Sequence, residues 1–213
     1  MKPVQEQLAE AFDASFPKDL QRGLLEILYN EYALAHEDAK KQWPGDLIKN
    51  IYPIIRRACI ERDVRDLVKG FPTVQAIQDS NELANCAFTR IVAGRIFMTI
   101  SAGDDPDSPV RQAKFRQNYA QLQADLFEDP QPVIPDAVYA ILHHGPAELQ
   151  PNVPAFARVI FPDGDLRSNA AYIDLMARFP EIVAAKVVVG EEKIEPTFET
   201  KIKPQEDKGQ AEK

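Results

Sequence analysis

Arginine is the residue type whose number and spacing first indicate chemistry in this sequence. Its guanidinium group binds phosphates and carboxylates through two parallel hydrogen bonds, so clustered arginines are typical of a site for an anionic partner. Residues 49–118 hold 11 basic and 8 acidic side chains, whereas the rest of the chain holds 14 basic and 25 acidic ones. We therefore predict a positively charged surface within an acidic chain, formed by Arg56, Arg57, Arg62, Arg65, Arg90, Arg95, Arg111 and Arg116.

A second interpretation of the same arginines is structural. Glu61, Asp63 and Asp66 lie three or four residues from several of them, which is the spacing at which ion pairs form on a helix surface. Cationic side chains paired in this way form a solvated helix face and bind nothing further. Aromatic residues also do not alternate with these basic residues, as they do on surfaces that bind single-stranded nucleic acid.

Two short motifs indicate metal-dependent hydrolysis as an alternative. Pro162-Asp163 is followed by Glu191 and Lys193, and this spacing resembles that of the PD-(D/E)xK nucleases. The resemblance implies that Asp163 and Glu191 would hold Mg²⁺, while Lys193 would stabilise charge or position the attacking water. Gly190 indicates a turn directly before the second motif, and a predicted helix separates the two. We predict no cofactor outside this alternative.

Histidine and cysteine offer two further candidates for chemistry. His143 and His144 follow a predicted strand, where neighbouring side chains point to opposite faces, so the two rings are not expected to share a metal ion. Cys86 could serve as a nucleophile with His143 as its general base, but nothing in the sequence brings the two residues together. Cys59 and Cys86 lack the spacing of a zinc site, and free thiols fit a reducing compartment. We predict no metal site here.

An acidic loop at residues 103–108 is the last candidate. Asp104, Asp105 and Asp107 could bind a cation, but the loop lacks the glycine and the distal glutamate of a calcium-binding loop. The three carboxylates directly precede a predicted helix, whose positive end favours negative charge. The structural explanation is therefore sufficient.

Composition limits the class of protein. The 213 residues are 45% hydrophobic and 27% charged, which is enough to bury a core, and the net charge of −8 argues against general coating of nucleic acid. The first residues lack the apolar segment of a secretory signal, and the longest uncharged stretch, residues 137–147, is too short to span a membrane. We expect a cytoplasmic protein that binds another protein, with nucleic acid as a second type of partner and no membrane contact.

The elements that must position these residues follow from the hydrophobic pattern. Helices are predicted over residues 4–14, 19–43, 46–69, 108–128 and 168–179. The helix over residues 46–69 is expected to start near Tyr52 or to kink at Pro53, and Ser108 is expected to cap the helix over residues 108–128. Strands are predicted over residues 73–78, 88–92, 95–100, 138–143, 157–161, 183–189 and 197–202, with a hairpin through Ala93-Gly94.

This order of elements predicts an α+β fold. A helix-rich N-terminal half with a β-hairpin is followed by a mixed-sheet C-terminal half with one intervening helix. Residues 1–130 and 131–203 are the two predicted regions, packed together or forming one continuous domain, and proline-rich residues 129–136 mark their boundary. Residues 204–213 are predicted to be a disordered tail. The function we predict is a non-enzymatic interaction or regulatory protein that engages an anionic partner through the arginine surface.

Overall fold

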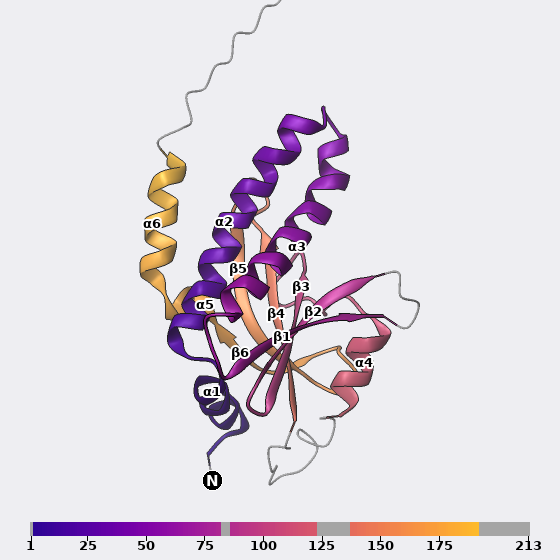
Figure 1. Cartoon of the computed structure of the whole chain (residues 1–213), viewed down its shortest axis with the longest axis vertical. Helices are drawn as coiled ribbons and strands as arrows, with labels where there is room; N and C mark the ends of the chain where they lie inside the picture. Colours follow the sequence, from indigo (N-terminus) through magenta and orange to yellow (C-terminus); the bar gives the residue numbers. More distant parts are fainter. Residues whose placement is uncertain (1, 82–85, 123–136, 192–213) are drawn as a thin grey trace, which may run out of the picture.

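The computed structural model describes residues 2–81, 86–122 and 137–191, with side chains up to residue 186. Three helices come first, α1 (Val4–Ser15), α2 (Lys18–Gln42) and α3 (Leu47–Val68). They are followed by β1 (Val74–Ser80), β2 (Ala87–Ala93), β3 (Ile96–Ala102) and α4 (Lys114–Gln121). The remaining elements are β4 (Val138–Pro146), β5 (Pro154–Pro162), β6 (Asn169–Asp174), α5 (Leu175–Arg178) and α6 (Pro180–Glu191). The fold is α+β, as predicted (Figure 1).

The six strands form one mixed sheet in the order in which they occur along the chain. Neighbouring strands are antiparallel except β3 and β4, which are parallel and are connected through the segment that carries α4. The predicted hairpin is confirmed: Ala93 of β2 lies opposite Ile96 of β3, and Gly94 in the turn has a φ of 56°, a conformation that glycine adopts without strain. The β3–β4 pair joins the two predicted regions within one sheet, while residues 129–136 and 204–213 lie outside the described ranges.

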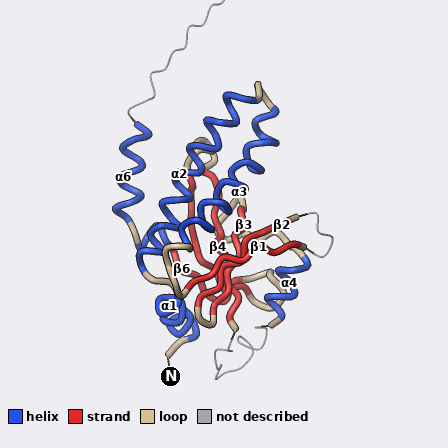
Figure 2. The backbone as a smooth tube through the Cα atoms, viewed as in Figure 1, coloured by secondary structure: helices blue, strands red, loops and turns tan. Residues whose placement is uncertain are grey.

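Helices cover the sheet on both faces, and the alternation along β4 shows how. Ala140 and Leu142 point into the main core, which α1, α2 and α3 close, whereas Tyr139 and Ile141 point into a smaller core on the side of α4. Figure 2 shows α2 and α3 side by side over the sheet, with α4 apart from them. A residue at the end of the sheet can therefore be reached from α3 on one side and from α4 on the other.

The long helices follow their hydrophobic spacing. Leu24, Leu28 and Tyr32 recur every four residues on α2 and are buried against the sheet and α3. Of the two alternatives for the third helix, a start near Tyr52 is wrong, because α3 begins at Leu47 and contains Pro53; a kink at Pro53 stays a prediction. Four residues of the arginine surface thus lie on one helix, namely Arg56, Arg57, Arg62 and Arg65.

The predicted helix over residues 168–179 is wrong for most of its length. Residues 169–174 form the edge strand β6, in which Ala171 and Ile173 are buried and Tyr172 is exposed, and only the short α5 follows it. The alternating burial fits a strand, and pairing with β5 outweighs the helix preference of the two adjacent alanines.

The predicted strand over residues 183–189 is also wrong, because this valine-rich segment belongs to α6. Pro180 at its first position and Glu181 in its first turn are both favourable at a helix start. The helix predicted over residues 108–128 begins later than expected, because α4 starts at Lys114. The amide and hydroxyl of Ser108 donate to the carbonyl of Asp105, so Ser108 closes a turn instead of capping a helix. The predicted strand over residues 197–202 lies outside the described part of the chain.

Candidate anion-binding cavity

Four of the eight predicted arginines line one cavity of about 770 Å³. It lies between the middle of α3, the residues that precede β2, the end of β3 and the start of α4. We call it the basic cavity, and its charged lining residues are Arg56, Arg57, Arg111, Lys114 and Arg116. The lining also includes Cys86, Ser101 and His144, together with apolar residues that include Ile54, Ile60, Ile100 and Phe115.

The topology of the sheet explains why the cavity is at this place. The carboxyl ends of the parallel strands β3 and β4 lie at the same edge, where Ala102 pairs with His144. In α/β sheets, ligands bind outside the carboxyl ends of parallel strands, where the connecting segments separate and leave a crevice. Here α3 forms one wall of that crevice and residues 111–116 form the other.

Arg56 is the most buried arginine of the cavity, with 5% of its surface exposed. Its guanidinium carbon lies 4.3 Å from the centre of the Tyr32 ring and 5.1 Å from that of Tyr52, so two aromatic faces hold it. Among the described residues, no carboxylate lies within ion-pair distance of it. A buried cation without a counter-ion is energetically costly, so its charge can be balanced by an anion that enters the cavity.

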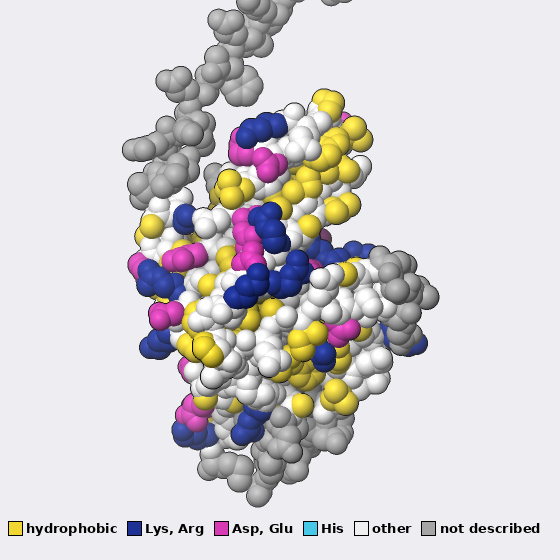
Figure 3. All heavy atoms as spheres, in the orientation of Figure 1, with side chains coloured by type: hydrophobic (Ala, Val, Ile, Leu, Met, Phe, Trp, Pro, Cys, Tyr) yellow, Lys and Arg dark blue, Asp and Glu magenta, His cyan; other side chains and the backbone are white. Residues whose placement is uncertain are grey.

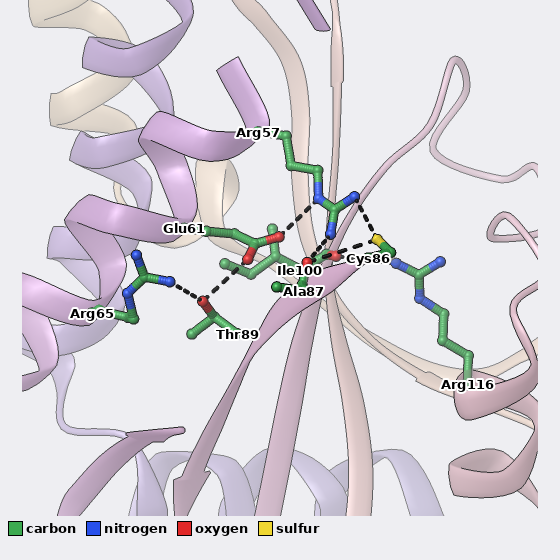
Figure 4. A network of polar contacts seen from close by, with 8 residues as sticks. All are labelled: Arg57, Glu61, Arg65, Cys86, Ala87, Thr89, Ile100 and Arg116. Carbon is green, nitrogen blue, oxygen red and sulfur yellow. Dashed lines mark hydrogen bonds and ion pairs between the residues drawn. The ribbon is translucent and has the colours of Figure 1, made fainter. Parts of the chain in front are cut away.

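Arg57 is the centre of a polar network that Figure 4 shows between α3 and the start of β2. Its Nε donates to Glu61 at 2.9 Å, one Nη donates to the carbonyl of Ala87 at 2.7 Å, and the other lies 3.3 Å from the thiol of Cys86. Glu61 in turn accepts from the hydroxyl of Thr89, to which Arg65 also donates. This network fixes Arg57 and places its cationic end beside a thiol.

Arg116 reaches the cavity from α4 and is held by main-chain oxygens. Its two Nη atoms donate to the carbonyls of Arg111 at 2.9 Å and Ile100 at 3.2 Å, while its buried Nε has no hydrogen-bond partner. Burial lowers the pKa of Arg116, and the nearby Arg57 and Arg111 lower it further. Arginine nevertheless remains protonated in proteins, so Arg116 keeps its charge and adds to the positive potential.

The start of α4 adds uncapped amide groups to the same wall. Ala113 stands at the N-cap position and offers no side-chain acceptor, and the first amide with an intrahelical partner is that of Gln117. The preceding amides at the start of the helix therefore have no acceptor within it. They carry the partial positive charge of the helix end, which favours an anion.

His144 closes the cavity on the side of the sheet as a neutral ring. Its Nδ1 lies 2.7 Å from the hydroxyl of Tyr32, and the ring is 3% exposed. Burial lowers the pKa of His144 well below its ordinary value, with a further contribution from Arg56. A neutral imidazole can either donate or accept a hydrogen bond, so His144 offers a polar contact without adding charge.

The other four arginines of the predicted surface do not line the basic cavity. Arg62 and Arg65 border a separate hollow of about 700 Å³ at α3 and β1, Arg90 lies on β2, and Arg95 lies in the β2–β3 turn. Arg62 contacts Asp63 at 2.5 Å and Arg90 contacts Asp79 at 3.6 Å, so their charges are balanced locally. On the face shown in Figure 3, lysine and arginine side chains cross the middle of the molecule beside a group of carboxylates.

The two motifs that indicated a metal-dependent nuclease gain no support from the structure. Asp163 lies in the turn between β5 and β6, where it accepts hydrogen bonds from the amide and hydroxyl of Ser168. Glu191 ends α6, so no strand precedes it, and Lys193 lies outside the described residues. Within the described ranges, no group of three histidine, cysteine, aspartate or glutamate residues could hold a metal ion. The alternative stays a prediction.

The remaining sequence candidates have structural explanations. His144 contacts Tyr32 on the side of α2, whereas His143 packs on Phe156 and Gly103, so the two rings lie on opposite faces of β4 as expected. In the acidic loop, Asp105 forms a turn and Asp107 forms an ion pair with Arg158 at 2.6 Å. Burial lowers the pKa of His143 to about 4, and Arg158 and Arg116 also favour its neutral form.

Several residues of the cavity were not predicted as parts of a site with the arginines. Phe115 and His144 line it, and Tyr32 supports it through Arg56 and His144, only because α4, β4 and α2 come together in the fold, and no local pattern indicates this. Comparison with models of protein families, with curated proteins and with solved structures gave no match to this chain. Over the described residues, no helix is both long enough and apolar enough to cross a bilayer.

Proposed function

We propose that this protein is a non-enzymatic binding protein that engages an anionic partner in the basic cavity. The observation that carries the proposal is that three of its guanidinium groups, those of Arg56, Arg111 and Arg116, have no carboxylate partner among the described residues. Aromatic rings hold Arg56 and carbonyl oxygens hold Arg116, and these neutral partners leave the positive charge unbalanced. An anion that enters the cavity would balance it.

An acidic segment of another protein is the partner that we favour. The unbalanced cations line one cavity, whereas a nucleic-acid backbone needs a basic surface that follows it over many phosphates. The net charge of −8 also disfavours a long polyanion while leaving a local contact intact. A regulatory role, in which the partner binds and leaves, is consistent with a cavity that opens to solvent.

Titration of the protein with a fluorescent peptide made of consecutive glutamates tests this proposal, with a labelled oligothymidine of similar charge for comparison. We expect the peptide to bind, the oligothymidine to bind more weakly, and the affinity to fall as NaCl rises from about 50 to about 200 mM. Arg111→Gln should weaken binding about tenfold, because it removes a charged donor from an exposed position of the cavity.

The matched control is Arg167→Gln, because Arg167 is 80% exposed and pairs with Asp165 far along the chain from the cavity residues. This variant should bind the peptide as the wild type does. Binding that is independent of salt, or equal in both variants and the wild type, would refute the proposal.

A further inference from the structure

The basic cavity contains more positive charge than a single carboxylate can balance. Arg56, Arg111 and Arg116 lack carboxylate partners among the described residues, and the start of α4 adds uncapped amides. A carboxylate brings one negative charge and two oxygens, whereas a phosphate monoester brings nearly two charges and three strong acceptor oxygens. The number of donors in the cavity therefore fits a phosphate group better than a carboxylate.

The donors also reach the cavity from opposite walls, which suits a tetrahedral ligand. Arg56 comes from α3, while Arg111, Arg116 and the amides of α4 come from the other side. A planar carboxylate can bind one guanidinium group with both oxygens, but it presents little to a donor on the opposite side. A phosphate presents oxygens in several directions and can be bound from both walls at once.

Part of the lining is apolar and would be unused by a free inorganic ion. Ile54, Ile60 and Ile100 line the cavity together with Phe115, whose ring stacks on Phe88 with the ring centres 4.0 Å apart. Ile54 is 66% exposed, which is high for a large aliphatic side chain. A volume of about 770 Å³ is within the range of sites for small organic ligands, so there is space for an organic body next to the charged group.

We infer that the basic cavity binds a phosphate monoester that carries an aromatic or other apolar body, and this inference rests on the proposed function. The phosphate contacts Arg56, Arg111 and Arg116 and the amides at the start of α4, and the apolar body lies against Ile54 and Phe115. The same chemistry occurs in a free aryl or alkyl phosphate and in a phosphorylated side chain of a partner protein. The phosphorylated side chain agrees with the acidic protein segment proposed above.

The thiol of Cys86 provides a direct measure of occupancy, because it lines the cavity and is half-buried. In a Cys59→Ser background, Cys86 is the single thiol, and its rate of alkylation by N-ethylmaleimide can be followed by mass spectrometry. We expect phenyl phosphate to slow this reaction at concentrations at least about tenfold lower than benzoate or inorganic phosphate. The complementary Cys86→Ser variant reports on Cys59, which lies outside the lining and should react at the same rate with and without phenyl phosphate.

Two substitutions tie the protection to the arginines. Arg111→Gln, at an exposed position, should raise the protecting concentration of phenyl phosphate about tenfold, and Arg56→Gln should raise it at least as much. Circular dichroism of Arg56→Gln shows whether that variant folds, and Arg111→Gln keeps the test decisive if it does not. Arg167→Gln should leave the protection unchanged.

Each outcome bears on a different part of the inference. Equal protection by benzoate would overturn the phosphate while leaving an anionic partner in place, and equal protection by inorganic phosphate would overturn the apolar body. If neither these anions nor the glutamate peptide protects Cys86, both the inference and the proposed function fail. A short phosphotyrosyl peptide that protects more strongly than phenyl phosphate supports a phosphorylated protein as the source, whereas equal protection supports a free phosphate ester.

Discussion

Glu31 is a buried carboxyl group whose protonation should couple the stability of the protein to pH near neutrality. It lies on α2, is 3% exposed and faces Asp63 and Cys59 of α3. Burial raises the pKa of Glu31 from 4.5 to about 7, and the adjacent Asp63 carboxylate contributes to the increase. Arg62 provides little compensation, because its nearest nitrogen is 3.8 Å from the Glu31 carboxylate and it pairs more closely with Asp63.

The folded protein therefore binds more protons than the unfolded chain between about pH 4.5 and 7. Its free energy of unfolding should fall as the pH rises through this window and should carry the full penalty of ionised Glu31 above about pH 7. A pKa increase from 4.5 to about 7 corresponds to at most about 3 kcal/mol. Arg62 favours the ionised form of Glu31 and is exposed to solvent, which screens the interaction, so we expect a penalty of about 2 kcal/mol.

Glu31→Gln removes the ionisable group and keeps its shape. We expect the variant to be more stable than the wild type by about 2 kcal/mol at about pH 8, with the difference falling within about 0.5 kcal/mol at about pH 5. Urea denaturation followed by circular dichroism at several pH values measures this difference. Other groups that titrate are common to both proteins and cancel in the comparison.

The matched control is Glu37→Gln on the same helix, because Glu37 is exposed and its ion pair with Lys40 spans 3.7 Å. This substitution should change stability by less than about 0.5 kcal/mol at every pH. A Glu31→Gln variant that is less stable than the wild type at about pH 8, or whose difference does not depend on pH, would refute the reasoning.

Two further substitutions test the packing around β4. Gly145→Ala should destabilise the protein by about 2–3 kcal/mol in urea denaturation, because a Cβ there would clash with the carbonyl oxygen of Gly103. The control is Gly70→Ala, whose Cβ would have its nearest contact at 3.4 Å, and this variant should lose less than about 1 kcal/mol of stability. Tyr32→Phe should cost about 1–3 kcal/mol in the same assay, because it leaves Nδ1 of the buried His144 without its partner. An unchanged stability of either variant would contradict the packing described for it.

Hydrophobic spacing predicted the elements whose own residues decide their structure. The four-residue repeat of Leu20, Leu24 and Leu28 places α2, and the hairpin of β2 and β3 follows from β-branched and aromatic residues on both sides of a glycine turn. The errors fall where tertiary pairing decides. Residues 169–174 are a strand because they pair with β5, whereas the valines of residues 183–189 continue a helix that begins at Pro180.

The candidate site was predictable in its charge but not in its geometry. The excess of basic residues between positions 49 and 118 indicated the arginines, since charge is a property of composition. The cavity requires the parallel pairing of β3 with β4, which brings Ala102 beside His144 across more than forty intervening positions. No local signal encodes that pairing, so neither the wall formed by α4 nor the contact of Tyr32 with His144 could be inferred beforehand.

The structure separates two roles among arginines that the sequence presents as one group. Arg62 and Arg90 contact carboxylates, which fix their positions and neutralise their charges at once. Arg56 and Arg116 are fixed instead by aromatic rings and carbonyl oxygens, which are neutral partners and leave the charge in place. A protein that used these arginines only for stability would gain more from carboxylate partners, since an unbalanced buried cation costs free energy. The neutral partners are therefore the reason to regard Arg56 and Arg116, and not the whole arginine group, as the residues arranged for an anion.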